Sequence, residues 1–282
     1  MRLNLLKQLL AVPTSSLHEE KLVSFLVEHV KERGVARCGQ VTVDAHNNVY
    51  VVKGNARCLP CVAAHIDSVH RWAEVEIVQQ DGTLVGFDRL GQQIGIGADD
   101  KAGVFVCLEL LEQFENIAVA FFAAEEIGCV GATHARPDFF DPVGYVLEFD
   151  CPGAGVVSYS VDGVRLFENE GDFIHAAMPV LRKHGLTNWQ RHPHTDVKAL
   201  RQRFDFSCLN VSAGYRNLHR RDEFVLLHEV EAAINSGEAL LRALGCRRYP
   251  FPVGAQDTAP PLFEVTCLNV PEIKTYESYC IH

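Results

Sequence analysis

Three short apolar segments of this chain are each followed directly by a histidine or a carboxylate. The pairs are residues 61–64 with His65, residues 117–124 with Glu125 and Glu126, and residues 143–149 with Asp150. Apolar segments this short, separated by turn-forming or polar sequence, are typical of buried strands. The carboxyl ends of strands in an open α/β sheet meet at one edge. The sequence therefore predicts that these polar side chains, which are far apart in the chain, converge on one site.

Helical patterns alternate with the strand patterns. Residues 16–33 are predicted to be helical, because Ser16 and Glu19 form a capping-box pattern and Gly34 follows the last turn. The other predicted elements are helices at 101–114 and 229–244 and strands at 41–43, 49–52, 209–213 and 263–267. This alternation predicts an α/β fold with a mixed, mostly parallel central sheet and helices on both faces, a three-layer sandwich.

The charge balance and the cysteines restrict the class of protein. Lys and Arg total 26 against 36 Asp and Glu, a net charge of -10, which argues against a basic surface for nucleic acid or anionic lipid. No apolar run approaches the roughly eighteen residues of a membrane span. Ten cysteines, mostly within apolar runs, fit a reducing compartment. Cys58 and Cys61 form an isolated C-x-x-C, for which strand packing or a redox role are the alternatives. We expect a soluble, cytoplasmic protein without a nucleic-acid or membrane partner.

The predicted convergence of carboxylates requires a cation. Asp99 and Asp100 join the strand-end residues from the loop that opens the helix at 101–114. Several carboxylates at one site repel one another unless a cation neutralises them. Oxygen and imidazole ligands suit zinc, with manganese or cobalt as alternatives. The number of ligands favours two divalent ions roughly 3.5–4 Å apart, with Asp99 as the candidate bridge.

Four motifs in order resemble those of a known superfamily. Residues 65–67 read His-Ile-Asp, residues 97–103 read Gly-Ala-Asp-Asp-Lys-Ala-Gly, residues 123–128 read Ala-Ala-Glu-Glu-Ile-Gly, and His219 comes late in the chain. This order, spanning about residues 5–225, resembles the co-catalytic di-zinc exopeptidases. That superfamily includes bacterial tripeptidases, glutamyl aminopeptidase-like enzymes and glutamate carboxypeptidases.

The resemblance implies a ligand set for two metal ions. The ligands are His65 and Asp150 for one ion, Glu126 and His219 for the other, and Asp99 as the bridge between them. His194 and His228 are the alternatives to His219. The resemblance also implies that Asp67 orients the imidazole of His65, and that Glu125 is the general base.

The chain is shorter than many members of that superfamily, which insert a lid or dimerisation domain after the strand matched by Asp150. Only 68 residues separate Asp150 from His219. We therefore expect one catalytic domain over residues 1–248 without a large lid, followed by a Pro-rich extension over residues 249–282. Tyr215 and Arg216 are the candidates for an oxyanion donor that a lid would otherwise supply. Packing or a salt bridge is the alternative role for either.

The expected function is hydrolysis of peptide bonds in short peptides by a metal-dependent aminopeptidase. The first alternative is an N-acyl amino acid deacylase or a carboxypeptidase with the same metal site, in which Arg216 would bind the substrate carboxylate. The second is a non-catalytic binding protein on the same fold, against which the presence of Glu125 argues. The sequence leaves a homo-oligomer open.

Overall fold

A mixed sheet forms the centre of the protein. The computed structural model describes residues 1–32, 39–192 and 194–255. In spatial order the strands are β1 (Gly39–Val43), β2 (Val49–Lys53), β7 (Ile117–Phe122), β3 (Leu59–His65), β8 (Val143–Cys151), β12 (Ser207–Ser212), β9 (Val156–Val161) and β10 (Val164–Arg165), with β11 (Asn188–His192) paired to β9. The pairings of β3 with β7 and β8, and of β8 with β12, are parallel, whereas the strands toward both edges include antiparallel pairs.

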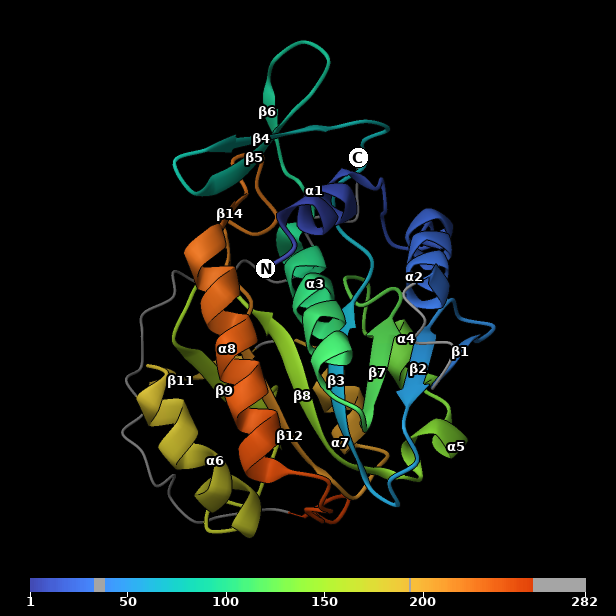
Figure 1. The fold of residues 1–282 in the computed structure, drawn as a ribbon, viewed down its shortest axis with the longest axis vertical. Helices are drawn as coiled ribbons and strands as arrows, with labels where there is room; N and C mark the ends of the chain where they lie inside the picture. The colour runs from blue at the N-terminus through green and yellow to red at the C-terminus, as the bar shows by residue number, and fades with distance from the viewer. Residues whose placement is uncertain (33–38, 193, 256–282) are drawn as a thin grey trace.

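Helices cover both faces of this sheet. They are α1 (Leu3–Ala11), α2 (Glu20–Glu32), α3 (Ala98–Gln113), α4 (Val130–Thr133), α5 (Pro137–Phe140), α6 (Asp172–Lys183), α7 (Asp196–Arg201) and α8 (Leu227–Leu244). In Figure 1, α3 and α8 cross the near face of the sheet and α7 lies behind it. Every residue of β3, β7 and β8 is buried, as expected for parallel strands covered on both faces. The predicted α/β three-layer fold is confirmed.

The first predicted helix begins later than its capping pattern indicated. Helix α2 starts at Glu20, so the prediction of a start at Ser16 was wrong. The Ser16 hydroxyl donates a hydrogen bond to Asp67 Oδ2 at 2.7 Å, and Glu19 Oε1 accepts one from the backbone N–H of Leu17 at 2.8 Å. A hydrogen bond from a hydroxyl to an ionised carboxylate is stronger than one between two neutral groups. The Ser16 hydroxyl therefore binds Asp67 and does not cap a helix. Gly34 lies outside the described residues.

Two other boundaries bear on the site. Strand β8 continues through Cys151, so Asp150 lies within the strand, and the prediction that it directly follows the strand was wrong. Helix α3 is assigned from Ala98, but Asp99 and Asp100 at its start have non-helical backbone angles, and the peptide bond between them is cis. Regular helix therefore begins near Lys101, where it was predicted.

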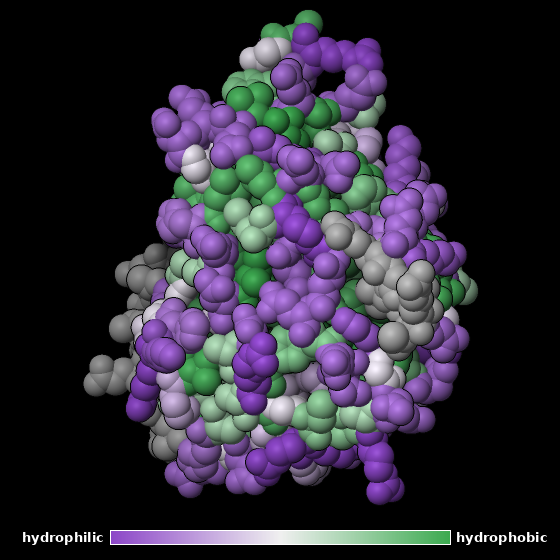
Figure 2. All heavy atoms as spheres, in the orientation of Figure 1, coloured by the Kyte–Doolittle hydropathy of each residue, from purple (hydrophilic) through white to green (hydrophobic). Residues whose placement is uncertain are grey.

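A second sheet, which the sequence patterns did not reveal, stands at one end of the molecule (Figure 1). In order its strands are β13 (Tyr215–Arg216), β14 (Phe224–Leu226), β5 (Thr83–Phe87) and β4 (Glu76–Gln80), with β6 (Gln93–Ile94) paired to β5. Figure 2 shows hydrophobic residues gathered where this sheet joins the body. Because β14 pairs with β5, the loop that carries His219, between β13 and β14, is fixed to this sheet.

The stretch between Asp150 and His219 builds the main sheet and its cover. Its described residues form β9 to β12, α6 and α7, and also β13 of the second sheet. The division into residues 1–248 and 249–282 stays a prediction, and the strand predicted at 263–267 lies outside the described residues.

Among the residues that the structure describes, no helix is both long and apolar enough to cross a membrane. Cys61 is fully buried in β3 with a free thiol.

Candidate metal centre

Neighbouring strand ends bring the predicted ligands together. His65 is the last residue of β3, Glu126 lies in the loop after β7, and Asp150 is the penultimate residue of β8. Strand β3 lies between β7 and β8, so these three side chains come from adjacent strand ends. Asp99 reaches the same place from the start of α3, and all four side chains are buried.

Asp99 lies between two imidazoles. Its Oδ1 is 3.1 Å from His65 Nε2, and its Oδ2 is 3.3 Å from His219 Nε2. On one side Asp150 Oδ1 lies 3.6 Å from His65 Nε2, and on the other Glu126 Oε2 lies 2.9 Å from His219 Nε2. Two groups of three side chains therefore share Asp99, and the candidate ligand atoms of each group lie within 4.8 Å of one another.

His219 is the late histidine that contacts Asp99 and Glu126. Its φ of +62° is the left-handed conformation, which few non-glycine residues adopt, in the loop between β13 and β14. His194 instead lies against Glu125 and Cys129. Of the late histidines, the geometry thus favours His219 as the residue that completes the second group.

Asp67 ties His65 to the loop that carries Glu125 and Glu126. Its Oδ1 lies 3.4 Å from His65 Nδ1. The same carboxylate accepts hydrogen bonds from the backbone N–H groups of Glu125 at 2.9 Å and Glu126 at 3.2 Å. Burial alone would raise the pKa of Asp67, but the hydrogen bonds from His65, Ser16 and this backbone lower it. An ionised Asp67 can therefore set the orientation of His65.

Asp150 is held by several hydrogen bonds. The Tyr215 hydroxyl donates to Asp150 Oδ1 at 3.1 Å, and the Thr195 hydroxyl lies 3.0 Å from Oδ2. The Asn210 side chain accepts from the backbone N–H of Asp150 and donates to its carbonyl oxygen. Thr195 also contacts Glu148, whose pKa is raised well above its usual value by burial and by the charge of Asp150. A neutral Glu148 can donate to Thr195, which frees the threonine hydroxyl to donate to Asp150.

Glu223 holds the loop that leads into Asp99. Its buried carboxylate accepts backbone hydrogen bonds from Ile96 and Gly97, both at 2.7 Å, and from Asp99 at 3.1 Å. Three backbone donors on one carboxylate fix the position of a short loop. Glu223 lies just before β14, so the second sheet contributes to placing Asp99 as well as His219.

Without a metal the site holds protons at neutral pH. Burial and the charge of Asp99 raise the pKa of Glu126 to about 7 against the hydrogen bond from His219. Burial alone would lower the pKa of His219, but the carboxylates of Asp99 and Glu126 raise it to about 10. These protons supply the positive charge that the buried carboxylates need, and a divalent cation would displace them. The imidazole and carboxylate donors fit zinc, manganese or cobalt.

Glu125 lies beside the His65 group. Its Oε2 is 4.0 Å from His65 Nε2. Burial and the nearby charges of Asp150 and Asp196 raise the pKa of Glu125 well above its usual value, although His65 acts in the opposite direction. A carboxylate with a raised pKa can accept a proton and return it near neutral pH.

The two candidate oxyanion donors are engaged elsewhere. The hydroxyl of Tyr215 is directed at Asp150, and the guanidinium of Arg216 makes an ion pair with Glu229 through its Nε, at 3.0 Å, and through Nη2. These contacts correspond to the alternative of packing or a salt bridge. The geometry therefore gives Tyr215 a contact to a candidate ligand and gives Arg216 a structural partner.

Several buried residues of the site escaped the sequence analysis. They are Glu148, Thr195, Asn210 and Glu223. One signal was available for Glu148: it precedes Asp150 by two residues in a strand and therefore shares its face. Glu223 had no such signal, because its partners are backbone groups of a loop that is remote in sequence.

Several solved structures share this fold. Aminopeptidase PepT from Bacillus cereus superposes with a TM-score of 0.72 at 14% identity over 86% of this chain and 97% of its own. A tripeptidase from Staphylococcus aureus gives 0.66 at 13% identity over 85% and 98%. The TET1 peptidase of Pyrococcus horikoshii gives 0.63 at 15% identity over 84% and 98%. These low identities establish the fold alone.

The family follows from the sequence match. A search of curated protein sequences found no match. Residues 47–214, more than half of the chain, match peptidase family M28. The matched segment contains His65, Asp99, Glu125, Glu126 and Asp150. The chain therefore belongs to peptidase family M28 and is a metal-dependent hydrolase of peptide bonds.

Proposed function

We propose that this protein is an aminopeptidase for short peptides that works with two zinc ions. The ligands would be His65 and Asp150 for one ion, Glu126 and His219 for the other, and Asp99 for both. The observation that carries this proposal is the position of Asp99, whose two carboxylate oxygens face two different imidazoles at 3.1 and 3.3 Å. Bound divalent ions would polarise the scissile carbonyl group and acidify water at the site.

The proposed chemistry assigns proton transfer to Glu125. Its carboxylate would take a proton from the attacking water and deliver it to the leaving amine. The raised pKa of the buried Glu125 supports this role, because the protonated form must persist until the amine departs. Asp67 would act on the same step indirectly, since it holds both His65 and the backbone of Glu125.

Recognition of a substrate amine is favoured over recognition of a substrate carboxylate. A carboxypeptidase or deacylase needs a cation for the carboxylate of its substrate. Arg216, the candidate for that role, is paired with Glu229. Lys101 is fully buried and its Nζ donates to the carbonyl oxygen of Val12 at 2.7 Å. Because Arg216 and Lys101 both have partners within the protein, neither is available to bind a substrate carboxylate. An aminopeptidase is therefore the better proposal.

Metal analysis combined with a substrate panel tests this function. Purified protein should contain about two zinc ions per chain and should hydrolyse peptides with a free amino terminus. Glu125→Gln should keep both metals and lose activity, whereas Asp99→Asn should lose metal. Glu74→Gln, which changes an exposed carboxylate paired with Arg89, is the matched control and should retain both properties. Turnover of N-acyl amino acids alone would replace the aminopeptidase proposal with the deacylase alternative.

We further propose a cytoplasmic location and self-association. The described cysteines are free thiols, in keeping with a reducing compartment. The TET1 peptidase of Pyrococcus horikoshii can assemble into a tetrahedron or a large octahedral shell. Light scattering of the purified full chain tests whether this protein also forms an oligomer.

A further inference from the structure

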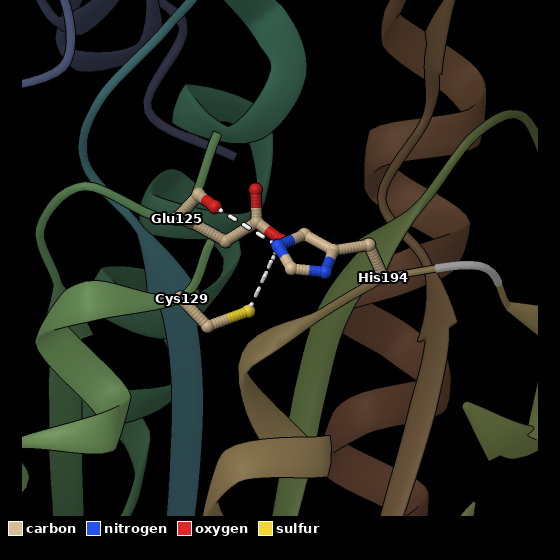
Figure 3. A group of neighbouring side chains, drawn as sticks. All are labelled: Glu125, Cys129 and His194. Atoms are coloured by element: carbon tan, nitrogen blue, oxygen red, sulfur yellow. Dashed lines mark hydrogen bonds and ion pairs between the residues drawn. The ribbon is translucent and has the colours of Figure 1, made fainter. Parts of the chain in front are cut away.

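A third group of candidate metal ligands lies beside the two that share Asp99. It consists of Glu125, Cys129 and His194 (Figure 3). Cys129 immediately precedes α4, four residues after Glu125, and His194 lies between β11 and α7. Helices α4 and α7 pack against each other, which brings the thiol and the imidazole together from distant parts of the chain.

The ligand atoms of this group are spaced as around a tetrahedral ion. Cys129 Sγ lies 3.3 Å from His194 Nε2 and 3.6 Å from Glu125 Oε1, and His194 Nε2 lies 3.7 Å from Glu125 Oε1. Zinc bonds of about 2.0–2.1 Å to nitrogen and oxygen and about 2.3 Å to sulfur give tetrahedral edges of roughly 3.3–3.6 Å. The three side chains therefore need little movement to coordinate one zinc ion.

The chemistry of the group also suits zinc. Thiolate, imidazole and carboxylate are the three ligand types that zinc prefers in proteins. Cys129 and Glu125 are buried, and the buried carboxyl group of Asp196 lies near the thiol. The side chain of His194 is 28% exposed, so an ion can reach the group from solvent.

His194 needs only a change of tautomer to act as a ligand. Its Nε2 lies 3.2 Å from the backbone oxygen of Glu125, to which it can donate a hydrogen bond in the absence of metal. With the proton on Nδ1 instead, the Nε2 lone pair faces Cys129 and Glu125. Coordination would also displace the proton of the Cys129 thiol.

We propose that Cys129, His194 and Glu125 form a third, inhibitory zinc site. An ion at this site occupies Oε1 of Glu125 and so withdraws the carboxylate from proton transfer. The inhibitory consequence rests on the proposed role of Glu125 as general base, whereas the existence of the site does not. Excess zinc is then expected to inhibit an enzyme whose two other metal positions are already filled.

Cobalt titration tests the site independently of activity. The two groups that share Asp99 offer only nitrogen and oxygen, so Co²⁺ bound there gives no thiolate-to-cobalt charge-transfer band. Zinc-loaded wild-type protein titrated with Co²⁺ should develop that band. Cys129→Ser should abolish it, and His194→Gln should weaken Co²⁺ binding by about tenfold or more. Cys246→Ser, which removes an exposed thiol, should leave the titration unchanged. A band that persists in Cys129→Ser overturns the proposal.

Zinc inhibition tests the consequence. Cys129→Ser and His194→Gln should keep basal peptidase activity and need about tenfold more zinc for the same inhibition than wild type or Cys246→Ser. Retention of the other two metals and an unchanged circular dichroism spectrum would verify that each variant is folded. If Cys129→Ser loses the cobalt band but is inhibited by zinc as strongly as wild type, the ion does not act through Glu125 and the inhibitory role is wrong. If Glu125→Gln instead retains activity, the proposed function of Glu125 fails while the cobalt result stands.

Discussion

The carboxylate of Glu223 accepts a hydrogen bond from the backbone N–H of Asp99 at 3.1 Å. The same carboxylate accepts two more hydrogen bonds, from the backbone N–H groups of Ile96 and Gly97. It therefore fixes the short loop that leads to Asp99, the candidate bridging ligand. Glu223 precedes β14 of the second sheet, whereas Asp99 lies at the start of α3, which packs against the main sheet. The second sheet therefore acts on the geometry of the metal centre, although among the described residues His219 is the only candidate ligand that its strands and loops carry.

Glu223→Gln should impair metal binding without touching a candidate ligand. A glutamine offers one acceptor oxygen, and its amide N–H groups would face backbone donors. We expect a loss of about 1–3 kcal/mol in the free energy of unfolding and roughly tenfold weaker metal binding. Urea denaturation and zinc titration check these values. Asp222→Asn, at the neighbouring residue, is the control and should resemble wild type in both experiments.

Asp67→Asn tests whether Asp67 supports metal binding by orienting the imidazole of His65, without being a metal ligand itself. The asparagine side chain can accept hydrogen bonds through its amide oxygen but not through its amide nitrogen. One of the contacts to His65, Glu125 or Glu126 is therefore lost. We expect metal affinity or kcat/KM to fall by about 10–100-fold. Asp172→Asn changes a largely exposed carboxylate and serves as the control. Wild-type activity and metal content in Asp67→Asn would show that the contact to His65 has no orienting role.

Tyr215→Phe should distinguish positioning of Asp150 from stabilisation of an oxyanion. The hydroxyl faces Asp150 Oδ1, and its removal leaves the buried ring in place. We expect weaker metal binding and a loss of about 1 kcal/mol in the free energy of unfolding. Tyr159→Phe, which removes a hydroxyl bonded to Arg191, is the control for loss of a phenol. An oxyanion donor would instead lower kcat by about 10²–10³-fold with metal affinity unchanged. Steady-state kinetics and metal titration together decide between the two roles.

The sequence was sufficient for the fold class and for the residues that converge. Short apolar segments identify β3, β7 and β8, and polar residues at their ends identify His65, Glu126 and Asp150 before any coordinates are known. The parts that escaped prediction depend on contacts between distant segments. The acceptor of the Ser16 hydroxyl is Asp67 and not its own helix, and Glu223 binds backbone groups more than 120 residues away. Local patterns contain no information about such partners.

The second sheet was not predicted from the sequence for a related reason. Strands β13 and β14 contain two and three residues, too few for a period-two pattern to be recognised. They are strands because β14 pairs with β5, which lies more than a hundred residues earlier. The position of His219 follows from that pairing, so the sequence could offer three candidate histidines but not the contact with Asp99 and Glu126.

Removal of the metals should make stability fall as the pH rises. In the metal-free protein the pKa of Glu126 is raised from 4.5 to about 7, and that of His219 from 6.5 to about 10. The folded chain therefore binds both protons more tightly than the unfolded chain. The contribution of Glu126 is full below about pH 4.5 and is lost as the pH rises through about 7, and that of His219 is full below about pH 6.5 and is lost through about 10.

The opposite trend is expected for the stabilisation that metal adds. Zinc competes with the protons on Glu126 and His219, so its affinity and its contribution to the free energy of unfolding should increase with pH. Urea denaturation from about pH 6 to about pH 9, with zinc or with chelator, measures both trends. The double variant Glu126→Gln and His219→Gln should remove the part of the metal-free slope that these two groups cause. If the metal-free protein instead gains stability over this range relative to the double variant, the two side chains do not share the buried protons that their contacts with Asp99 imply.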